Sequence, residues 1–257
     1  FKMQANITPA FSGRTYADFE LDFAGAILNT SGGSALSIDN LTVTQGTLNS
    51  GMTGTTGHSI KGNINVAPGA TLNFSPITAS TFNLNGTVAQ SINSSGTLTF
   101  NDNQSLAINN SNGITLNTNV TLGIFGVLTL TNGRLILGNN NLVLTNSTPD
   151  PGGAIASASA SSYIVTNGTG ALQRAVSGPG LFGFPVGYST VWQPSSITFG
   201  AFTGGPTTLS ARFITGWGGN NGLTPPLMET LPDPDLTIDR ISVIGYWEIV
   251  AGAVIPD

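Results

Sequence analysis

Alternation of apolar and polar residues, without helical spacing, is the feature that most constrains how this chain folds. It is clearest in residues 113–145, GITLNTNVTLGIFGVLTLTNGRLILGNNNLVLT. Period-two patterning is typical of strands with one buried and one solvated face, whereas an amphipathic helix needs apolar residues three and four apart. Each alternating run is short and ends at Gly or Asn. The pattern therefore predicts many short strands in succession, with no helix between them.

A short unit, G-x-[LIV]-x-apolar, recurs through the first part of the chain. It is seen in GTLNS, GNINV, GATLNF, GTLTF and GRLIL. A looser repeat relates residues 39–51 to residues 118–133, with Gly46 matched to Gly126. A unit of this kind cannot bury its own apolar face and must stack on its neighbours. We therefore predict an all-β fold, a parallel β-helix (β-solenoid) followed by a small antiparallel β-sandwich.

Asn-Gly pairs favour a competing interpretation. They occur at Asn85-Gly86, Asn112-Gly113 and Asn132-Gly133, and Asn-Gly is a strong β-hairpin signal. An antiparallel sandwich over the whole chain is the alternative fold. The solenoid is favoured because hairpins alone explain neither the uniformly polar composition of the first part of the chain nor its recurrent strand unit.

The composition changes at residues 148–153, TPDPGG, where two prolines and a Gly pair predict a boundary. We expect the solenoid to span residues 1–149 and the sandwich residues 150–257, continuing beyond the chain given. The second part has longer, more aromatic runs, and all three Trp residues lie in it. Such runs, separated by turn signals, are typical of a sandwich.

Charged residues make up only 7% of the chain, against about 25% in an average soluble domain. A net charge of −5 with seven Lys and Arg argues against nucleic-acid binding, which needs a concentrated basic face. The absence of Cys excludes disulfides and thiolate metal sites. No apolar run approaches the roughly 18 residues of a membrane span. The first residues lack a signal-peptide pattern, so we expect a removed signal or a segment of a longer chain.

A family resemblance extends from about Ala89 to Phe213 and, more faintly, over the first 80 residues. It rests on TVAQSI, LAINNSNGITLNTNVTL, GVLTLTNGRLILGNNNLVL, SSYIVTNGTGALQR and FPVGYST-x-x-QPSSITF. This succession resembles large secreted surface proteins of Bacteroidetes, in which β-helical repeats precede a small sandwich. Such proteins are similar to adhesin-like and gliding-associated proteins, commonly exported by the type IX system. The resemblance implies an extracellular or cell-surface location, and it supplies no catalytic motif.

Enzymes that act on polysaccharides often have a parallel β-helix fold, so the chain could in principle have a catalytic site. Glycoside hydrolysis usually needs two carboxylates about 5 to 10 Å apart. Between residues 24 and 148 the only acids are Asp39 and Asp102, far apart in sequence. The single histidine, His58, has no neighbouring acid in GHSIKG, so we expect a solvated turn there. One His without Cys also argues against zinc. We therefore predict that the chain is not an enzyme.

Two further groups of acidic residues could have a role other than catalysis. In METLPDPDLTID, the carboxylates of Asp233, Asp235 and Asp239 are weak candidates for a structural Ca²⁺ site, against the favoured reading of a solvated loop. No other cofactor is expected. Three acids alternate over residues 18–22 on one predicted strand face. We interpret them as an exposed edge that repels edge-to-edge pairing.

Aromatic residues of the second part give the main alternative function. Tyr188, Trp192 and Trp217 are candidates for stacking on sugar rings, although core packing is their favoured role. A second idea is ice binding by regular Thr ranks on a flat solenoid face. The Thr pairs 42/44, 97/99 and 129/131 are spaced too irregularly to favour it.

These observations favour a non-enzymatic extracellular surface protein, an adhesin-like stalk or filament-forming scaffold. Its expected partners are other modules or copies of itself, joined end to end, which requires an uncapped coil near residues 1–22. A carbohydrate-binding module and, less favoured, a polysaccharide-acting enzyme are the alternatives.

Overall fold

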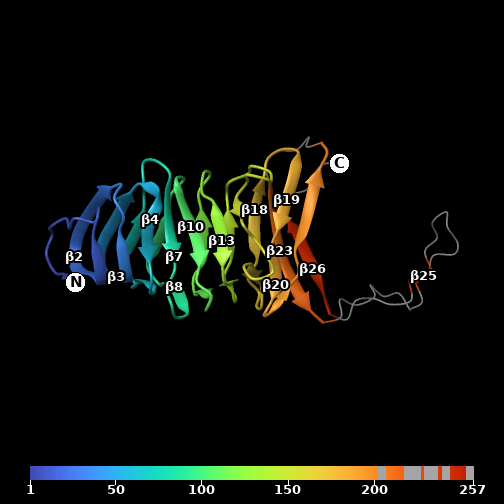
Figure 1. Ribbon diagram of the computed structural model, residues 1–257, viewed down its shortest axis with the longest axis horizontal. Coiled ribbons are helices and arrows are strands. Elements are labelled where there is room, and N and C mark those ends of the chain that lie inside the picture. Colours follow the sequence, from blue (N-terminus) through green and yellow to red (C-terminus); the bar gives the residue numbers. More distant parts are fainter. Residues whose placement is uncertain (202–206, 217–226, 229–236, 239–243, 253–257) are drawn as a thin grey trace.

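The computed structural model describes residues 1–201, 207–216, 227–228, 237–238 and 244–252. Of these, residues 1–201, 207–216 and 244–252 form an elongated rod (Figure 1). All regular structure among them is β. The strands form a β-solenoid of about eight turns, which confirms the predicted parallel β-helix. Short alternating runs give this result because each buries its apolar side only against the coils above and below it.

The rod begins with long strands. β1 (Lys2–Met3) pairs in parallel with part of β2 (Thr15–Gly32), and β2 pairs in parallel with β3 (Ser37–Met52). The register of β2 and β3 shifts after Leu21, where the chain turns a corner of the coil. These strands therefore follow the coil around more than one of its faces.

Later coils divide into separate strands, most of which pair in parallel with their equivalents in the preceding coil. The first face contains β4 (Gly54–Ile60), β7 (Ser80–Leu84), β10 (Gln104–Asn109), β13 (Leu128–Asn132) and β16 (Ile155–Ala156). The second face contains β5 (Ile64–Val66), β8 (Gln90–Ser94), β11 (Ile114–Leu116), β14 (Leu135–Ile136), β17 (Ile164–Val165) and β20 (Val186–Tyr188). The third face contains β6 (Thr71–Phe74), β9 (Thr97–Phe100), β12 (Val120–Leu122), β15 (Leu142–Leu144) and β18 (Leu172–Val176).

The predicted boundary at residues 149/150 falls inside this stack. Strands β16, β17 and β18 follow the boundary, yet each pairs in parallel with the coil before it. The Pro- and Gly-rich residues 148–153 lie between β15 and β16, at the corner between the third and first faces. They enlarge one corner of the solenoid, and the coils continue to Tyr188 on the second face.

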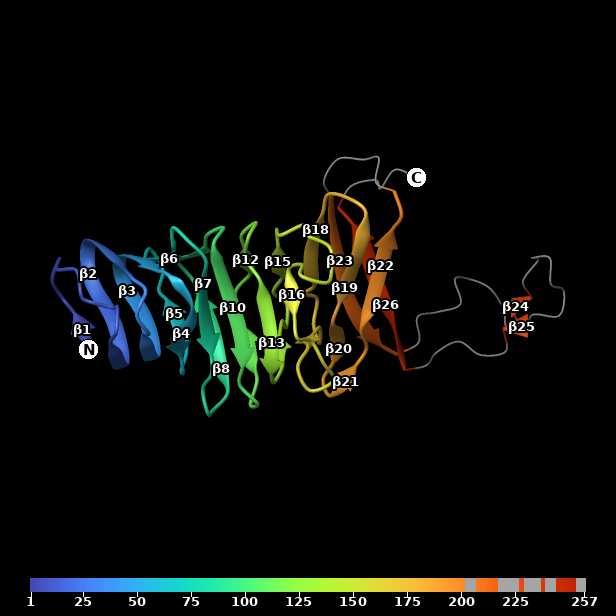
Figure 2. The same cartoon turned by 45° about the horizontal axis from the view of Figure 1, so that its top comes forward.

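Antiparallel strands follow, as predicted, but they are built directly on the last coils. β23 (Thr207–Thr215) pairs antiparallel with β18, and β26 (Gly245–Ala251) pairs with β23, so they extend the third face (Figure 2). β19 (Gly180–Phe184) pairs with β22 (Ser195–Phe199), and β21 (Val191–Trp192) with β20. A separate pair is formed by β24 (Leu227–Met228) and β25 (Thr237–Ile238).

One apolar core runs through the coils. On the third face Leu48 and Leu72 stack in register and are buried, while the residues beside them point outward. Burial of each such side chain contributes about 1.5–3 kcal/mol. The Asn-Gly pairs lie at corners: Gly113 and Gly133 have φ of 83°, the left-handed region that glycine adopts most readily. These pairs turn the coil and do not close hairpins.

Outward-facing amides form ladders along the rod. Asn49 Nδ2 donates to Asn29 Oδ1 at 2.8 Å, and Asn73 Nδ2 donates to Asn49 Oδ1 at 2.8 Å. An amide carries both donor and acceptor, so the same residue type can repeat from coil to coil. A second ladder links Asn65, Asn93 and Asn117 at 2.7 Å per step.

Candidate functional site

The acids expected in the coils do not come together. Asp39 lies at the corner between the first and second faces, beside Lys61. Asp102 lies between β9 and β10, at the corner between the third and first faces, where its Oδ1 accepts a hydrogen bond from the Ile124 N–H at 3.4 Å. Within the part of the chain that the structure describes, no three His, Asp or Glu residues gather as a metal-binding group.

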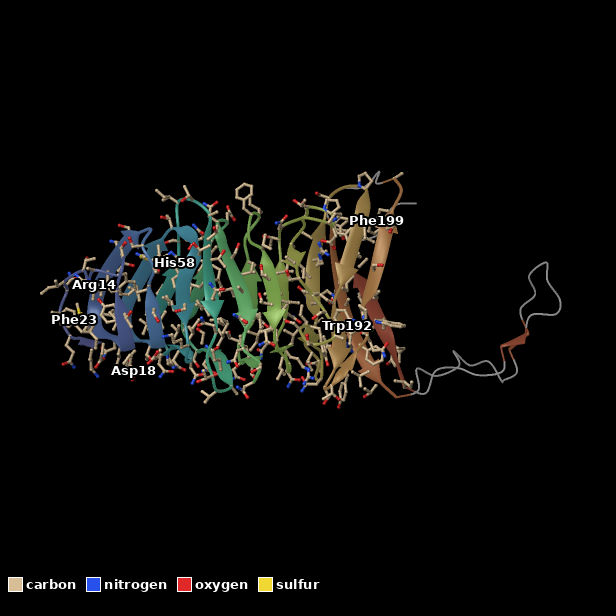
Figure 3. The ribbon with its side chains drawn as sticks, viewed as in Figure 1. Arg14, Asp18, Phe23, His58, Trp192 and Phe199 are labelled. Carbon is tan, nitrogen blue, oxygen red and sulfur yellow. The ribbon has the colours of Figure 1, made fainter. Side chains whose placement is uncertain are left out.

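His58 is not the solvated turn residue that the sequence predicted. Its ring is fully buried on β4 (Figure 3) and stacks on Phe82 with centroids 5.3 Å apart. Nδ1 accepts from the Leu36 N–H at 3.3 Å, and Nε2 lies 2.7 Å from the Thr53 carbonyl oxygen. These contacts fit the neutral ring that carries its proton on Nε2. Alternation along β4 turns the ring inward, where it has a structural role.

The acids of residues 18–22 do not form a free, repelling edge, because β1 pairs with this part of β2. Lys2 Nζ lies 2.7 Å from Asp22 and 3.3 Å from Glu20. The hydrogen bond from Lys2 is the main cause that lowers the pKa of Asp22. Asp22 also accepts from Gln45 on the next coil. The interpretation as an exposed edge is therefore wrong for this segment, and β1 covers part of the coil near residues 1–22 that was expected to be uncapped.

Several predicted site residues lie outside the described residues. They are the Ca²⁺ candidates Asp233, Asp235 and Asp239, and the aromatic candidate Trp217.

The remaining aromatic candidates, Tyr188 and Trp192, do not share a surface. Trp192 pairs with Gly187, the residue next to Tyr188, so the two side chains point to opposite faces of the β20–β21 hairpin. The half-buried Trp192 ring packs against the buried ring of Tyr163 with centroids 5.4 Å apart. Trp192 thus has the packing role that the sequence favoured, whereas Tyr188 borders a groove.

This groove, which we call the terminal groove, lies where the last coil meets β23 and β26, and its volume is about 410 Å³. It is lined by Thr166, Asn167, Gly168, Tyr188, Arg212, Phe213, Ile214, Thr215 and Tyr246. In the register of β23 and β26, Ile214 faces Tyr246 and Arg212 faces Glu248. Since alternate residues share a face, these four side chains lie on one side of the two strands.

An ion pair links β23 and β26 on this side of the two strands. Arg212 Nε donates to Glu248 Oε1 at 2.7 Å, and Arg212 Nη2 donates to Glu248 Oε2 at 3.1 Å. The hydrogen bond from Arg212 lowers the pKa of Glu248. Conversely, the hydrogen bond with Glu248 is the main cause that raises the pKa of Arg212, with a smaller contribution from nearby Tyr246. The pair is charged and bidentate, so its geometry is fixed.

Hydrogen bonds from the last coil hold the groove walls. Thr166 Oγ1 accepts from the Phe213 N–H at 3.0 Å and lies 3.2 Å from the carbonyl oxygens of both Gly187 and Phe213. Arg212 Nη1 donates to the Gly168 carbonyl oxygen at 3.3 Å. The turn 166–168 and strand β23 are therefore tied together before any ligand arrives.

A second charged contact lies deeper in this end of the rod. Arg174, fully buried on β18, donates to Asp150 Oδ2 at 2.7 Å and to the Gly183 carbonyl oxygen at 2.7 Å. Its guanidinium carbon lies 5.4 Å from the Phe182 ring centroid. Asp150 Oδ2 also accepts from the Gly183 N–H at 2.8 Å. All these contacts join the enlarged corner to β18 and β19, so we assign them a structural role.

Sequence reasoning missed Arg212, Tyr246 and Glu248. The alternation in TTLSARFIT and YWEIVA places them on outward faces, but the strands are separated by a long stretch of sequence. The sequence does contain one usable signal: each of these two runs has an outward-facing residue of opposite charge, an Arg in one and a Glu in the other, which could have predicted that the two strands pair.

Comparison with known proteins yields no match: no family model, curated protein or solved structure is similar to the chain. Among the described residues there is no helix with the length and hydropathy required to cross a bilayer.

Proposed function

We propose that this chain is a non-enzymatic stalk or filament-forming scaffold of an extracellular surface protein, joined end to end to further modules or copies. The observation that carries the proposal is the third face, which runs along the rod from the second half of β2 to β26 with one break in strand pairing, between β9 and β12. Among the described residues, the outer edges of β2 beyond residue 27 and of β26 have no strand partner. The same layer thus has an open edge at each end of the rod (Figure 1).

Both open edges carry exposed apolar side chains. Ile27 is 60% exposed on β2, and Val250 is 52% exposed on β26. Exposed strand edges bind further strands by backbone hydrogen bonds, and apolar side chains add affinity. Because the two edges belong to opposite ends, such a contact is heterologous and extends indefinitely. This arrangement suits a filament or a chain of modules.

The structure of the coils and the surface along the rod are also consistent with a stalk. Stacked coils supply stiffness, and the amide ladders present a neutral polar surface. Neutral hydrogen-bonding groups are much less sensitive to salt than exposed ion pairs. A spacer of this type keeps its shape in variable extracellular surroundings.

The end-to-end contact is tested by concentration-dependent light scattering and negative-stain electron microscopy. Ile27→Lys and Val250→Lys each place a charge on one open edge, and we expect each to shorten or abolish the chains of rods. Ile77→Lys is the matched control, because Ile77 is 86% exposed in the turn between β6 and β7. Single rods at every concentration of the unmodified protein, or equal loss in all three variants, would count against this contact.

The proposed location rests on the resemblance to Bacteroidetes surface proteins, which implies export by the type IX system. Antibody labelling and protease treatment of intact producing cells test it, and we expect the protein to be accessible from outside. Incubation with soluble polysaccharides tests the non-enzymatic assignment, since release of new reducing ends would contradict it.

A further inference from the structure

We propose that the terminal groove binds a neutral oligosaccharide. This goes beyond the role of a stalk and does not depend on it, because the groove lies on a side of the two strands and away from their outer edges. It assigns the rod a recognition site at the end where the antiparallel strands lie.

Aromatic rings border the groove from two separate elements. Tyr188 comes from β20 of the last coil, and Tyr246 from β26. Tyr188 packs partly on the core, whereas Tyr246 is 37% exposed. A tyrosine ring offers an apolar face to the C–H groups of a sugar, and its hydroxyl remains available for hydrogen bonds. Neither phenol hydroxyl has a hydrogen bond to another residue in the described ranges.

The charged pair beside these rings determines which sugars fit. Glu248 already neutralises Arg212 through two hydrogen bonds, so the groove has no uncompensated positive charge for a uronate or sialate. Bonds to Glu248 and Gly168 use three of the five N–H groups of Arg212 and fix its guanidinium, which leaves one N–H on each of Nη1 and Nη2 for a ligand. The Tyr188 and Tyr246 hydroxyls can both donate and accept. Adjacent sugar hydroxyls, each both donor and acceptor, match that pattern. The chemistry therefore favours a neutral glycan.

The groove is formed in advance and has a suitable size. Thr166 and Gly168 hold its walls through their contacts with Phe213 and Arg212. Its volume of about 410 Å³ lies within the usual range for small-ligand sites, roughly 300–1,000 Å³. A rigid site loses less conformational entropy on binding than one that must be ordered first.

Other hollows lack this combination. The hollow over the corner of residues 24–27 and 44–47 is about 480 Å³ but contains neither an aromatic nor a charged side chain. A small hollow of about 150 Å³ borders Asp150, whose carboxylate already binds Arg174. The hollow beside Asp39 and Lys61 is about 440 Å³ and has no aromatic residue. The terminal groove alone among these combines ring faces with a fixed hydrogen-bonding fork.

Isothermal titration calorimetry of the whole chain tests the proposal with cellohexaose, xylohexaose, mannohexaose and laminarihexaose, and with tri-galacturonate as the anionic probe. We expect at least one neutral hexaose to bind, and Tyr246→Ala to weaken that binding about tenfold through loss of a stacking ring. Phe125→Ala is the matched control, because Phe125 is an exposed aromatic in the turn between β12 and β13. It should leave the affinity unchanged.

A second experiment measures binding of the same ligands to the Glu248→Gln variant. This substitution leaves Arg212 without its counter-charge, so we expect weaker binding of the neutral hexaose and new binding of tri-galacturonate. Thermal unfolding of each variant shows that it is folded. The proposal is overturned if no neutral hexaose binds the unmodified chain, if Tyr246→Ala binds as tightly as the unmodified chain, or if tri-galacturonate binds the unmodified chain more tightly. None of these results bears on end-to-end association, so the two proposals fail separately.

Discussion

The parallel coils and the antiparallel end of this rod are held together by different polar contacts. In the coils, neutral amides bond to equivalent amides one turn away, as in the Asn29–Asn49–Asn73 ladder. At the antiparallel end, Arg212 bonds to Glu248 across two strands, and next to it, where the last coils meet these strands, Arg174 of β18 bonds to Asp150 of the enlarged corner.

Strand direction and repetition explain the difference. In a stack of similar coils, each position faces its own equivalent, so a charge in the repeating unit would meet a like charge about 4.8 Å away. An amide has no such conflict, because it both donates and accepts. Antiparallel strands bring unlike positions together, so Arg can face Glu. The scarcity of charge that the sequence shows is therefore a requirement of the coils.

The largest effect is expected for Arg174→Met on β18, the strand where the coils meet the antiparallel end. The substitution removes a buried guanidinium and leaves the Asp150 carboxylate without its counter-charge. Breaking a buried pair in this way costs about 3–5 kcal/mol. Urea unfolding measures the change in the free energy of unfolding.

The double variant Arg174→Met/Asp150→Asn is the control for that result. It removes both charges together, so it should recover part of the lost stability. A single variant as stable as the unmodified chain would show that the ion pair is not needed to join the enlarged corner to β18.

A like-charge pair placed in the coils tests the explanation directly. Asn49→Asp alone should be tolerated, because the Asn29 amide can rotate to donate. Asn49→Asp combined with Asn73→Asp stacks two carboxylates, and we expect the pair to lose about 1–3 kcal/mol more than the sum of the single variants. Added salt should reduce this excess.

The opposite arrangement, Asn49→Asp with Asn73→Lys, is the control for the stacked carboxylates. It should restore most of the stability, because unlike charges attract at the same spacing. Equal stability of the two double variants would remove like-charge repulsion as the reason for a charge-poor stack.

Acid should weaken the antiparallel end through Glu248. Its pKa is lowered in the folded chain, so its contribution is present above the ordinary value of 4.5 and is lost as the pH falls through the lowered folded value. Glu248 is substantially exposed, so the loss is small. Urea midpoints measured from neutral pH downward should fall less for Glu248→Gln than for the unmodified chain in this acid range. Equal falls would contradict the assignment.

The smallest effect is expected for Lys2→Gln at the first coil. Lys2 lies 2.7 Å from Asp22, but both side chains contact solvent, and exposed pairs contribute little. We expect no measurable change in the free energy of unfolding. A clear loss would show that β1 depends on this contact to cover the first coil.

Much of the fold could be predicted from the sequence because alternation reports directly on strands with a buried face. The length of a coil could not be predicted, since residues that hydrogen-bond between successive coils are separated by 20 to 30 positions and the corners vary. Matching Gly46 to Gly126 failed for this reason: the neighbouring Leu48 lies on the third face and Leu128 on the first. Likewise, residues 148–153 were predicted to be a boundary between domains but form an enlarged corner of the solenoid.

The site was harder to predict than the fold. Tyr188 was a candidate, but its partners Arg212 and Tyr246 come from strands that meet only after a long intervening segment, and no local pattern reports that pairing. His58 was misread because GHSIKG has the composition of a turn, while the alternation of β4 decides which way the ring points.

The stacking order has a consequence for how such a rod is made. Every coil pairs with the one that precedes it in sequence, so no segment of the stack needs to wait for a distant partner. A chain that emerges N-terminus first, from a ribosome or through a narrow pore, can add one turn at a time, each completed turn serving as the template for the next. Synthesis, passage and folding can then proceed in the same direction.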